Sequence, residues 1–394
     1  MSLSLNERDR RWNALNKAMA EHGIDALVFA ANDYRGHKGS LRYVADYNLA
    51  HRSGNAVMYH GEEPFLVLPG NLSAARRPTS GWVSDYRFTP TIAQGLVDAF
   101  ARRPDVDRVG VIGLEHVMKV GEYLALTRSC PDVEFVDFSR EFERIRAVKS
   151  DEEIAGAEES AYILDQCLAR LLEIARPGAV EREIAAEMYK IGHQLGGEDA
   201  LFLTMYTEGC GPDTAATFGA PRDRVLGTHN VHTFSFEITG PAGYWTELSR
   251  MVTFARADAE VERMARAAAR GIARGAGGMR PGATPASVQQ QVLDAVEAEG
   301  ATSSYWSGHS LGLDVLEHPM IGLDVVEDGG QSHDGTLEAG FVVTLHPMVK
   351  DENAGVSGYM ADTFVIDESG SRKLSEYPTG LYRISRGEVF INEY

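Results

Sequence analysis

The spacing of apolar residues alternates between a helical and a strand period in the first third of the chain. Residues 10–33, RRWNALNKAMAEHGIDALVFAAND, predict an amphipathic helix that stops at Gly23, followed by a buried strand over Ala26–Ala30. The segment NAVMYHGEEPFLVLPG predicts a hairpin with a Gly-Glu-Glu turn. RVGVIGLEH and VEFVDFS predict two more short strands with a helix between them. These elements indicate a small α/β domain.

A long helix marks the start of a second domain. Ser150 with Glu153 three residues later forms a capping box, and the helix that it opens ends at Pro177-Gly178. Because 394 residues are many for one hydrophobic core, we expect two domains, an N-terminal α/β domain over 1–148 and a second domain over 149–394.

The second domain contains a faint internal repeat. ARPGAVEREIAAEMYKIGHQLGG (175–197) is similar to MRPGATPASVQQQVLDAVEAEGA (279–301), and each copy lies between a long helix and a predicted β-hairpin. The two hairpins span 232–254 and 341–366. A duplicated helix–helix–hairpin unit would bring both hairpins together about a pseudo-twofold axis, with polar residues of both halves at the centre.

Composition and charge exclude several classes of protein. An apolar fraction of 44% and a charged fraction of 24% are typical of a soluble globular protein. No run of eighteen apolar residues occurs and MSLSLNERDRRW has no apolar signal core, so we expect a cytoplasmic protein. A formal charge of −19 argues against nucleic acid or an anionic membrane as partner. Cys130, Cys167 and Cys210 are too few for a disulfide framework and are expected to be buried thiols; a nucleophilic Cys210 in TEGCGPD is the weaker alternative.

Four ionisable residues occupy apolar strand or loop positions of the second domain. They are Glu237 in TFSFEI, Glu247 after the turn GPAGYW, His309 in WSGHSLGLDVLEHP and His346 in VVTLHPM. A charged side chain in a buried strand is costly unless it is paired or bound to a metal. One such residue is unremarkable, but four at corresponding places in two repeats predict a common cavity. The glycines around His309 predict a tight loop that presents its ring.

The motifs of the second domain resemble those of the creatinase/aminopeptidase P/prolidase superfamily, the M24 or pita-bread proteins. SGHSLGLDVLEHP, LEAGFVVTLHPM and GYMADTFVIDESG are similar to its C-terminal motifs, and GPDTAATFGAPRDRVL and FEITGPAGYWTELSR to its earlier ones. HGIDALVF and LRYVADYNLAHRSGNAVMY resemble the N-terminal domain of creatinase and prolidase. The resemblance implies an α+β fold, with a pita-bread C-terminal domain and a creatinase-like N-terminal α/β domain.

The chain departs from the peptidase members of this family at most catalytic positions. Where they have the metal ligands Asp, Asp, His, Glu and Glu, the matching positions here are Glu237, Glu247, His309, His346 and either Ala361 or Asp362. Glu237 and Glu247 are one residue closer than the family's pair, and only one of Ala361 and Asp362 can face inward because adjacent strand residues point to opposite sides. Phe218 and Leu316 replace two family histidines.

Two states of this centre are consistent with the resemblance. In the first, Glu247, His309 and His346, with or without Glu237, bind one divalent ion, for which Zn²⁺, Fe²⁺ and Mn²⁺ are suited. In the second there is no metal, and His309 is a general acid/base oriented by Glu247 or Glu237. His318 is either a further proton carrier or a polar residue before Pro319.

Substrate-binding residues are expected in two places. In creatinase an arginine near the motif matching NLAHRSG reaches the active site of the other subunit, which implies a homodimer in which Arg52 or His51 anchors a substrate carboxylate; a solvated loop arginine is the alternative. Aromatic residues of the site motifs would wall a pocket for a small apolar or cationic substrate; they are Phe218, Tyr305, Trp306 and Tyr359.

The leading hypothesis is therefore a non-peptidase member of the family that hydrolyses a C–N bond of a small carboxylated metabolite, as creatinase-like amidinohydrolases and ectoine hydrolases do. A lyase of the same fold that cleaves a C–S or C–C bond is an alternative. A metal-dependent Xaa-Pro peptidase is disfavoured by Phe218, Leu316 and Ala361, and an inactive binding protein is the last alternative.

Overall fold

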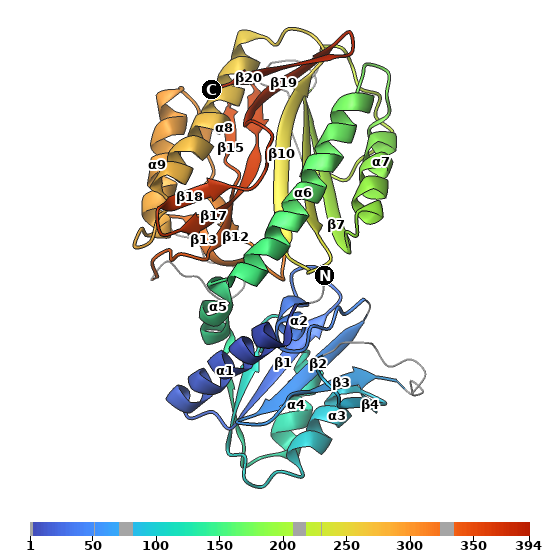
Figure 1. Ribbon diagram of the computed structural model, residues 1–394, viewed down its shortest axis with the longest axis vertical. Helices are drawn as coiled ribbons and strands as arrows, with labels where there is room; N and C mark the ends of the chain where they lie inside the picture. Colours follow the sequence, from blue (N-terminus) through green and yellow to red (C-terminus); the bar gives the residue numbers. More distant parts are fainter. Residues whose placement is uncertain (1–2, 51, 71–81, 208–217, 230, 324–334) are drawn as a thin grey trace. The chain divides into compact units, whose positions relative to one another are not determined.

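The computed structural model describes residues 3–50, 52–70, 82–207, 218–229, 231–323 and 335–394 (Figure 1). The chain divides into two compact units, Met1–Ala147 and Val148–Tyr394. Within the described residues, every helix is too short or too polar to cross a membrane.

The N-terminal unit is built on a six-stranded sheet of order β4-β3-β2-β1-β5-β6. Strand β1 pairs antiparallel with β2 and parallel with β5, and its apolar residues are buried on both faces. The predicted first helix and its stop are confirmed, since Gly23 ends α1 with a left-handed φ of 62°. The elements are α1 (Leu5–His22), β1 (Ala26–Asn32), α2 (Gly39–Ala45), β2 (Ser53–Tyr59), β3 (Phe65–Pro69), β4 (Tyr86–Thr89), α3 (Ile92–Phe100), β5 (Arg108–Ile112), α4 (Val120–Ser129), β6 (Glu134–Asp137) and α5 (Ser139–Ala147).

The C-terminal unit begins with the predicted capping box. The Ser150 hydroxyl accepts a hydrogen bond from the Glu153 backbone N–H, and the Glu153 carboxylate accepts one from the Ser150 N–H, which together satisfy two free donors at the start of α6. The helices of this unit are α6 (Asp151–Ile174), α7 (Glu181–Gln194), α8 (Ala259–Gly278) and α9 (Pro285–Ala298).

The predicted duplication is confirmed. Helices α6 and α7 are followed by the antiparallel hairpin β9 (Val231–Thr239) and β10 (Trp245–Thr253), and α8 and α9 by the antiparallel pair β14 (Val342–Leu345) and β17 (Ala361–Asp367). The central order of the large sheet is β12-β14-β17-β10-β9-β7, so the two hairpins lie side by side. In Figure 1, α6 crosses the half of the sheet that contains β10, and α8 and α9 lie beside the other half.

The remaining strands extend this sheet or form a small one. The large sheet also contains β7 (Asp199–Thr207), β8 (Phe218–Gly219), β12 (Trp306–Ser310), β13 (Glu317–Gly322), β18 (Gly370–Lys373), β19 (Gly380–Ser385) and β20 (Glu388–Glu393). The small sheet consists of β11 (Thr302–Ser303), β15 (Met348–Asp351) and β16 (Val356–Tyr359).

Candidate metal centre

Three of the four predicted polar side chains meet at the centre of the large sheet. One ligand atom from each of Glu247, His309 and His346 lies within 4.8 Å of the others. Glu247 comes from β10, His309 from β12, and His346 directly follows β14, so both halves of the duplicated unit contribute. The three residues are only 4%, 7% and 8% exposed, respectively, so the site is buried.

The expectation that His309 lies on a glycine loop is wrong, because the residue is in strand β12. β12 pairs antiparallel with β14, and His309 lies opposite Thr344. A Cβ atom at Gly308 would collide with the backbone oxygen of Thr344, so this glycine permits the close approach of two strands. The strand pairing, and not a loop, therefore directs the His309 ring.

The Glu247 carboxylate is held at both oxygens. The Tyr359 hydroxyl donates to Oε1 at 2.9 Å, and the Thr344 hydroxyl donates to Oε2 at 3.1 Å. Burial raises the pKa of Glu247, while the neighbouring His309 and these two hydroxyls act against the increase. A cation in the site would supply the positive charge that balances the buried carboxylate.

Both histidines are held in the neutral form that binds metals. Burial lowers the pKa of His309 to about 4, with a further contribution from His346, and burial lowers the pKa of His346 to about 4. The Nδ1 of His309 lies 2.9 Å from the backbone oxygen of Ser310. Since a carbonyl oxygen can only accept, Nδ1 is assigned the proton and Nε2 the free lone pair. Two neutral imidazoles and one carboxylate fit a Zn²⁺, Fe²⁺ or Mn²⁺ ion.

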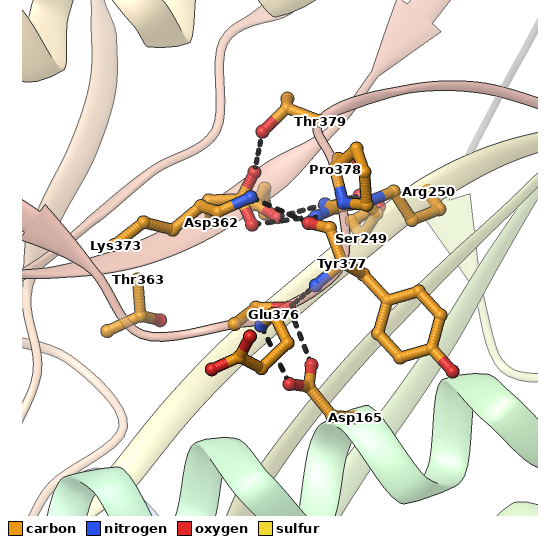
Figure 2. Close-up of polar contacts among 12 residues, drawn as sticks. Asp165, Ser249, Arg250, Asp362, Thr363, Lys373, Glu376, Tyr377, Pro378 and Thr379 are labelled. Atoms are coloured by element: carbon orange, nitrogen blue, oxygen red, sulfur yellow. Dashed lines mark hydrogen bonds and ion pairs between the residues drawn. The ribbon is translucent and has the colours of Figure 1, made fainter. Parts of the chain in front are cut away.

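Asp362 faces away from this centre, which answers the question of register on β17. Its carboxylate accepts a hydrogen bond from Arg250 Nη2 at 2.8 Å, and both side chains are fully buried on the other face of the sheet. Figure 2 shows this pair together with Thr379, whose hydroxyl also donates to Asp362. Ala361 consequently faces the centre, where it packs with Met205, Phe218 and Tyr359.

Aromatic rings lie beside the two histidines, and they include most of the residues that were expected to wall a pocket. The Trp306 ring centroid lies 5.2 Å from that of His346 and 5.9 Å from that of His309. Phe218 contacts Tyr359 edge-on at 4.5 Å. Tyr305 is different, since it lies at the surface with 58% of its area exposed.

The other predicted residues lie outside the three-residue group. Glu237 pairs directly with Glu247 across β9 and β10, so it faces the same side of the sheet, and it is half-buried. His318 is half-buried on β13, next to Glu317. Glu317 has a structural role, because it binds Lys149 Nζ at 3.0 Å and accepts hydrogen bonds from the N–H groups of the turn after β12.

Three further predictions concern residues elsewhere in the chain. Arg52 is exposed in the N-terminal unit, has a left-handed φ of 70° and lines a pocket of about 420 Å³ with Lys119. His51 and Cys210 lie outside the described residues. Cys130 and Cys167 are buried, as expected for them.

The sequence interpretation missed Thr344. This residue precedes His346 by two positions, and the two-residue period of a strand places both on one face, so the alternation in VVTLHP could have indicated it. The Tyr359 hydroxyl was also missed, because Tyr359 was considered only as an aromatic wall.

Comparison with known proteins identifies the family. Residues 155–368 match the model of metallopeptidase family M24, and residues 11–148 match the creatinase/prolidase N-terminal domain. The chain belongs to metallopeptidase family M24. The predicted superfamily and its two-part fold are thereby confirmed.

Two relatives of this M24 chain are named for different activities. It is 26% identical over 383 residues to the uncharacterized peptidase YqhT of Bacillus subtilis, covering 93% of this chain and 98% of the relative. It is also 26% identical over 412 residues to an ectoine hydrolase of Halomonas elongata, covering 95% and 96%.

Solved structures of the same fold include dipeptidase PepE from Mycobacterium ulcerans, with a TM-score of 0.77, 21% identity and coverage of 98% of this chain and 100% of that one. A prolidase from Thermococcus sibiricus has a TM-score of 0.78 and 17% identity, with coverage of 97% and 99%. At these identities the structural likeness establishes the fold alone.

Proposed function

We propose that this chain hydrolyses a C–N bond of a small carboxylated metabolite at a single divalent ion held by Glu247, His309 and His346. The observation on which the proposal rests is Ala361. Its methyl group packs on the face of the sheet toward the three ligands, at the position where the resemblance implies a peptidase carboxylate.

A dinuclear centre needs a carboxylate that bridges two ions about 3.5–4 Å apart. Ala361 offers no oxygen, and the acid next to it in sequence, Asp362, is paired with Arg250 on the opposite face. The three grouped ligands suffice for one ion in a catalytic site, which keeps a further position open for water or substrate.

When bound, the ion would polarise a substrate carbonyl or amidine and lower the pKa of water. In the proposed reaction Glu237, opposite Glu247 on the adjacent strand, accepts the proton of the attacking water. Trp306, Phe218 and Tyr359 would enclose the substrate. His318 stays a predicted proton carrier. The metal-free alternative, with neutral His309 as general base beside Glu247, uses the same residues.

An ectoine hydrolase among the relatives, similar along almost its whole length, supports a non-peptide substrate. A metal-dependent Xaa-Pro peptidase is the second candidate, because other relatives are named peptidases. Phe218 and Ala361 argue against it, since they place an aromatic ring and a methyl group in the site.

The decisive experiment combines metal analysis with a substrate panel. Protein purified without added metal should contain one divalent ion per chain, and the loaded enzyme should cleave small N-acyl or amidine carboxylates faster than Xaa-Pro dipeptides. His309→Ala should remove the ion and the activity, while His60→Ala, at an exposed histidine of the N-terminal unit, should change neither. Two ions per chain with efficient Xaa-Pro cleavage would establish the peptidase instead.

We further propose a homodimer in which Arg52 of one subunit binds the substrate carboxylate in the site of the other. Its left-handed backbone supports a functional role, because a non-glycine residue in this conformation is strained. The Arg52 N–H donates to the Asp33 carboxylate at 2.9 Å, which holds the residue in this conformation.

Two measurements test this arrangement. Arg52→Ala should raise KM for a carboxylated substrate far more than it lowers kcat, and Arg102→Ala, at an exposed arginine of the same unit, should alter neither constant. A monomer in size-exclusion chromatography would exclude the arrangement.

A further inference from the structure

The hydroxyl of Tyr359 donates a hydrogen bond to the Glu247 carboxylate. We infer that Tyr359 is a positioning residue, whose hydroxyl fixes the Glu247 carboxylate for one ion and occupies the side of that carboxylate where a second ion would bind. The inference rests on the metal centre of the proposed function and deepens it.

The Glu247 carboxylate accepts a hydrogen bond at each of its two oxygens. Tyr359 and Thr344 donate to different oxygens, at 2.9 and 3.1 Å, so the carboxylate is held from both sides. A bridging carboxylate instead offers one oxygen to each of two ions at about 2.0–2.2 Å. On the lone pair of Oε1 that accepts from Tyr359, an approaching ion would meet the positive end of the O–H dipole and the phenol oxygen behind it, while the second lone pair of each oxygen is left for the single ion.

The ring of Tyr359 is packed among several neighbouring side chains. Tyr359 is 9% exposed, and its ring contacts Phe218 edge-on at 4.5 Å and lies 5.8 Å from the ring of His346. Met205, Ala361 and Phe218 form one apolar cluster with it. The ring is therefore confined, and the hydroxyl has little freedom to leave Oε1.

The composition of this cluster links two departures from the peptidase pattern. By the resemblance, Phe218 replaces a histidine and Ala361 a carboxylate, and both belong to one apolar cluster with Tyr359. A glutamate at 361 would place a charge within the cluster that holds the phenol ring, and a histidine at 218 would replace its edge-on partner. A single cause thus accounts for both substitutions: together they form the apolar surface on which the Tyr359 ring packs.

The test compares Tyr359→Phe with the wild-type enzyme in metal binding. Removing one hydrogen bond to a metal ligand is expected to weaken Zn²⁺ affinity about 10- to 100-fold, measured by competition with a chromogenic chelator. The visible absorption of the Co²⁺-loaded protein should also change, because the freed Oε1 alters the ligand geometry. Tyr162→Phe removes a hydroxyl from a residue of α6 that is 57% exposed and is the matched control, expected to match the wild type.

The outcomes distinguish a failure of the role of Tyr359 from a failure of the proposed function. Unchanged Zn²⁺ affinity and Co²⁺ absorption in Tyr359→Phe, with one ion in the wild type, would overturn the role of Tyr359 and leave the proposed function intact. A wild-type chain that binds two ions, or none, would refute both. Tyr359→Leu, which also lacks the hydroxyl but has a smaller side chain, repeats the test if the phenylalanine variant does not fold by circular dichroism.

Discussion

Replacing Asp362 by alanine should destabilise the C-terminal unit by about 3–5 kcal/mol, the usual cost of removing one partner of a buried ion pair. Asp362 and Arg250 are both fully buried, with 2.8 Å between Oδ1 and Nη2. The guanidinium cannot lose its proton, so the substitution leaves a cation without its partner in the interior.

The surroundings of the pair set the magnitude. Arg250 also donates to four backbone oxygens, those of Ser249, Ala361, Tyr377 and Pro378, and these bonds remain in the variant and hold the guanidinium in place. They engage four of its five N–H donors and do not balance its charge. Asp165, a buried acid that interacts electrostatically with Arg250, is engaged by Ser375 and the N–H of Glu376, as Figure 2 shows in part. The cost should therefore stay near the buried-pair range.

Differential scanning calorimetry measures the effect, since a unit of this size loses about 2–4 °C of Tm per kcal/mol. We expect the transition of the C-terminal unit to fall by about 10 °C. Asp223→Ala breaks an exposed ion pair with Arg182 and should cost less than about 1 kcal/mol. The double variant Asp362→Leu/Arg250→Met should recover most of the loss. A single variant within about 2 °C of wild type would show that Asp362 does not balance the Arg250 charge.

Further predictions concern the site and the histidines. Gly308→Ala should lower both stability and metal affinity, measured by calorimetry and chelator competition, because its Cβ would displace Thr344; unchanged values would contradict the close strand contact. Burial lowers the pKa of His232 to about 4 in the folded state, so unfolding takes up a proton between this value and about 6.5. The contribution of His232 to the free energy of unfolding should therefore fall by about 2 kcal/mol as the pH is lowered from 7.5 to 5, and urea titration of His232→Gln should lack this share. Glu237→Gln should reduce kcat with little loss of bound metal, whereas Glu247→Gln should lose the metal, as elemental analysis would record.

The features that could be predicted from the sequence are those that depend on residues close together along the chain. The left-handed stop at Gly23 and the capping box of Ser150 each follow from a few positions of local chemistry. The face of Asp362 could not be predicted in this way, because it depends on its pairing with Leu248 of β10, more than one hundred residues away. The strand position of His309 likewise depends on contact with β14. Local glycines are as typical of a loop as of two closely packed strands.

The Tyr359 hydroxyl also separates the roles that we propose for the two glutamates. Its single proton is donated to Glu247, while burial and then Glu247, with a smaller contribution from Glu237, raise the pKa of Tyr359 well above 10.0. The tyrosine therefore stays protonated and cannot serve as a base in the neutral range. Glu247, held at both oxygens, is suited to bind an ion and poorly suited to move with a proton. Glu237, on the same face but less buried, is the acid left to exchange protons with water, and the register of β9 and β10 keeps it one strand away from the proposed ion.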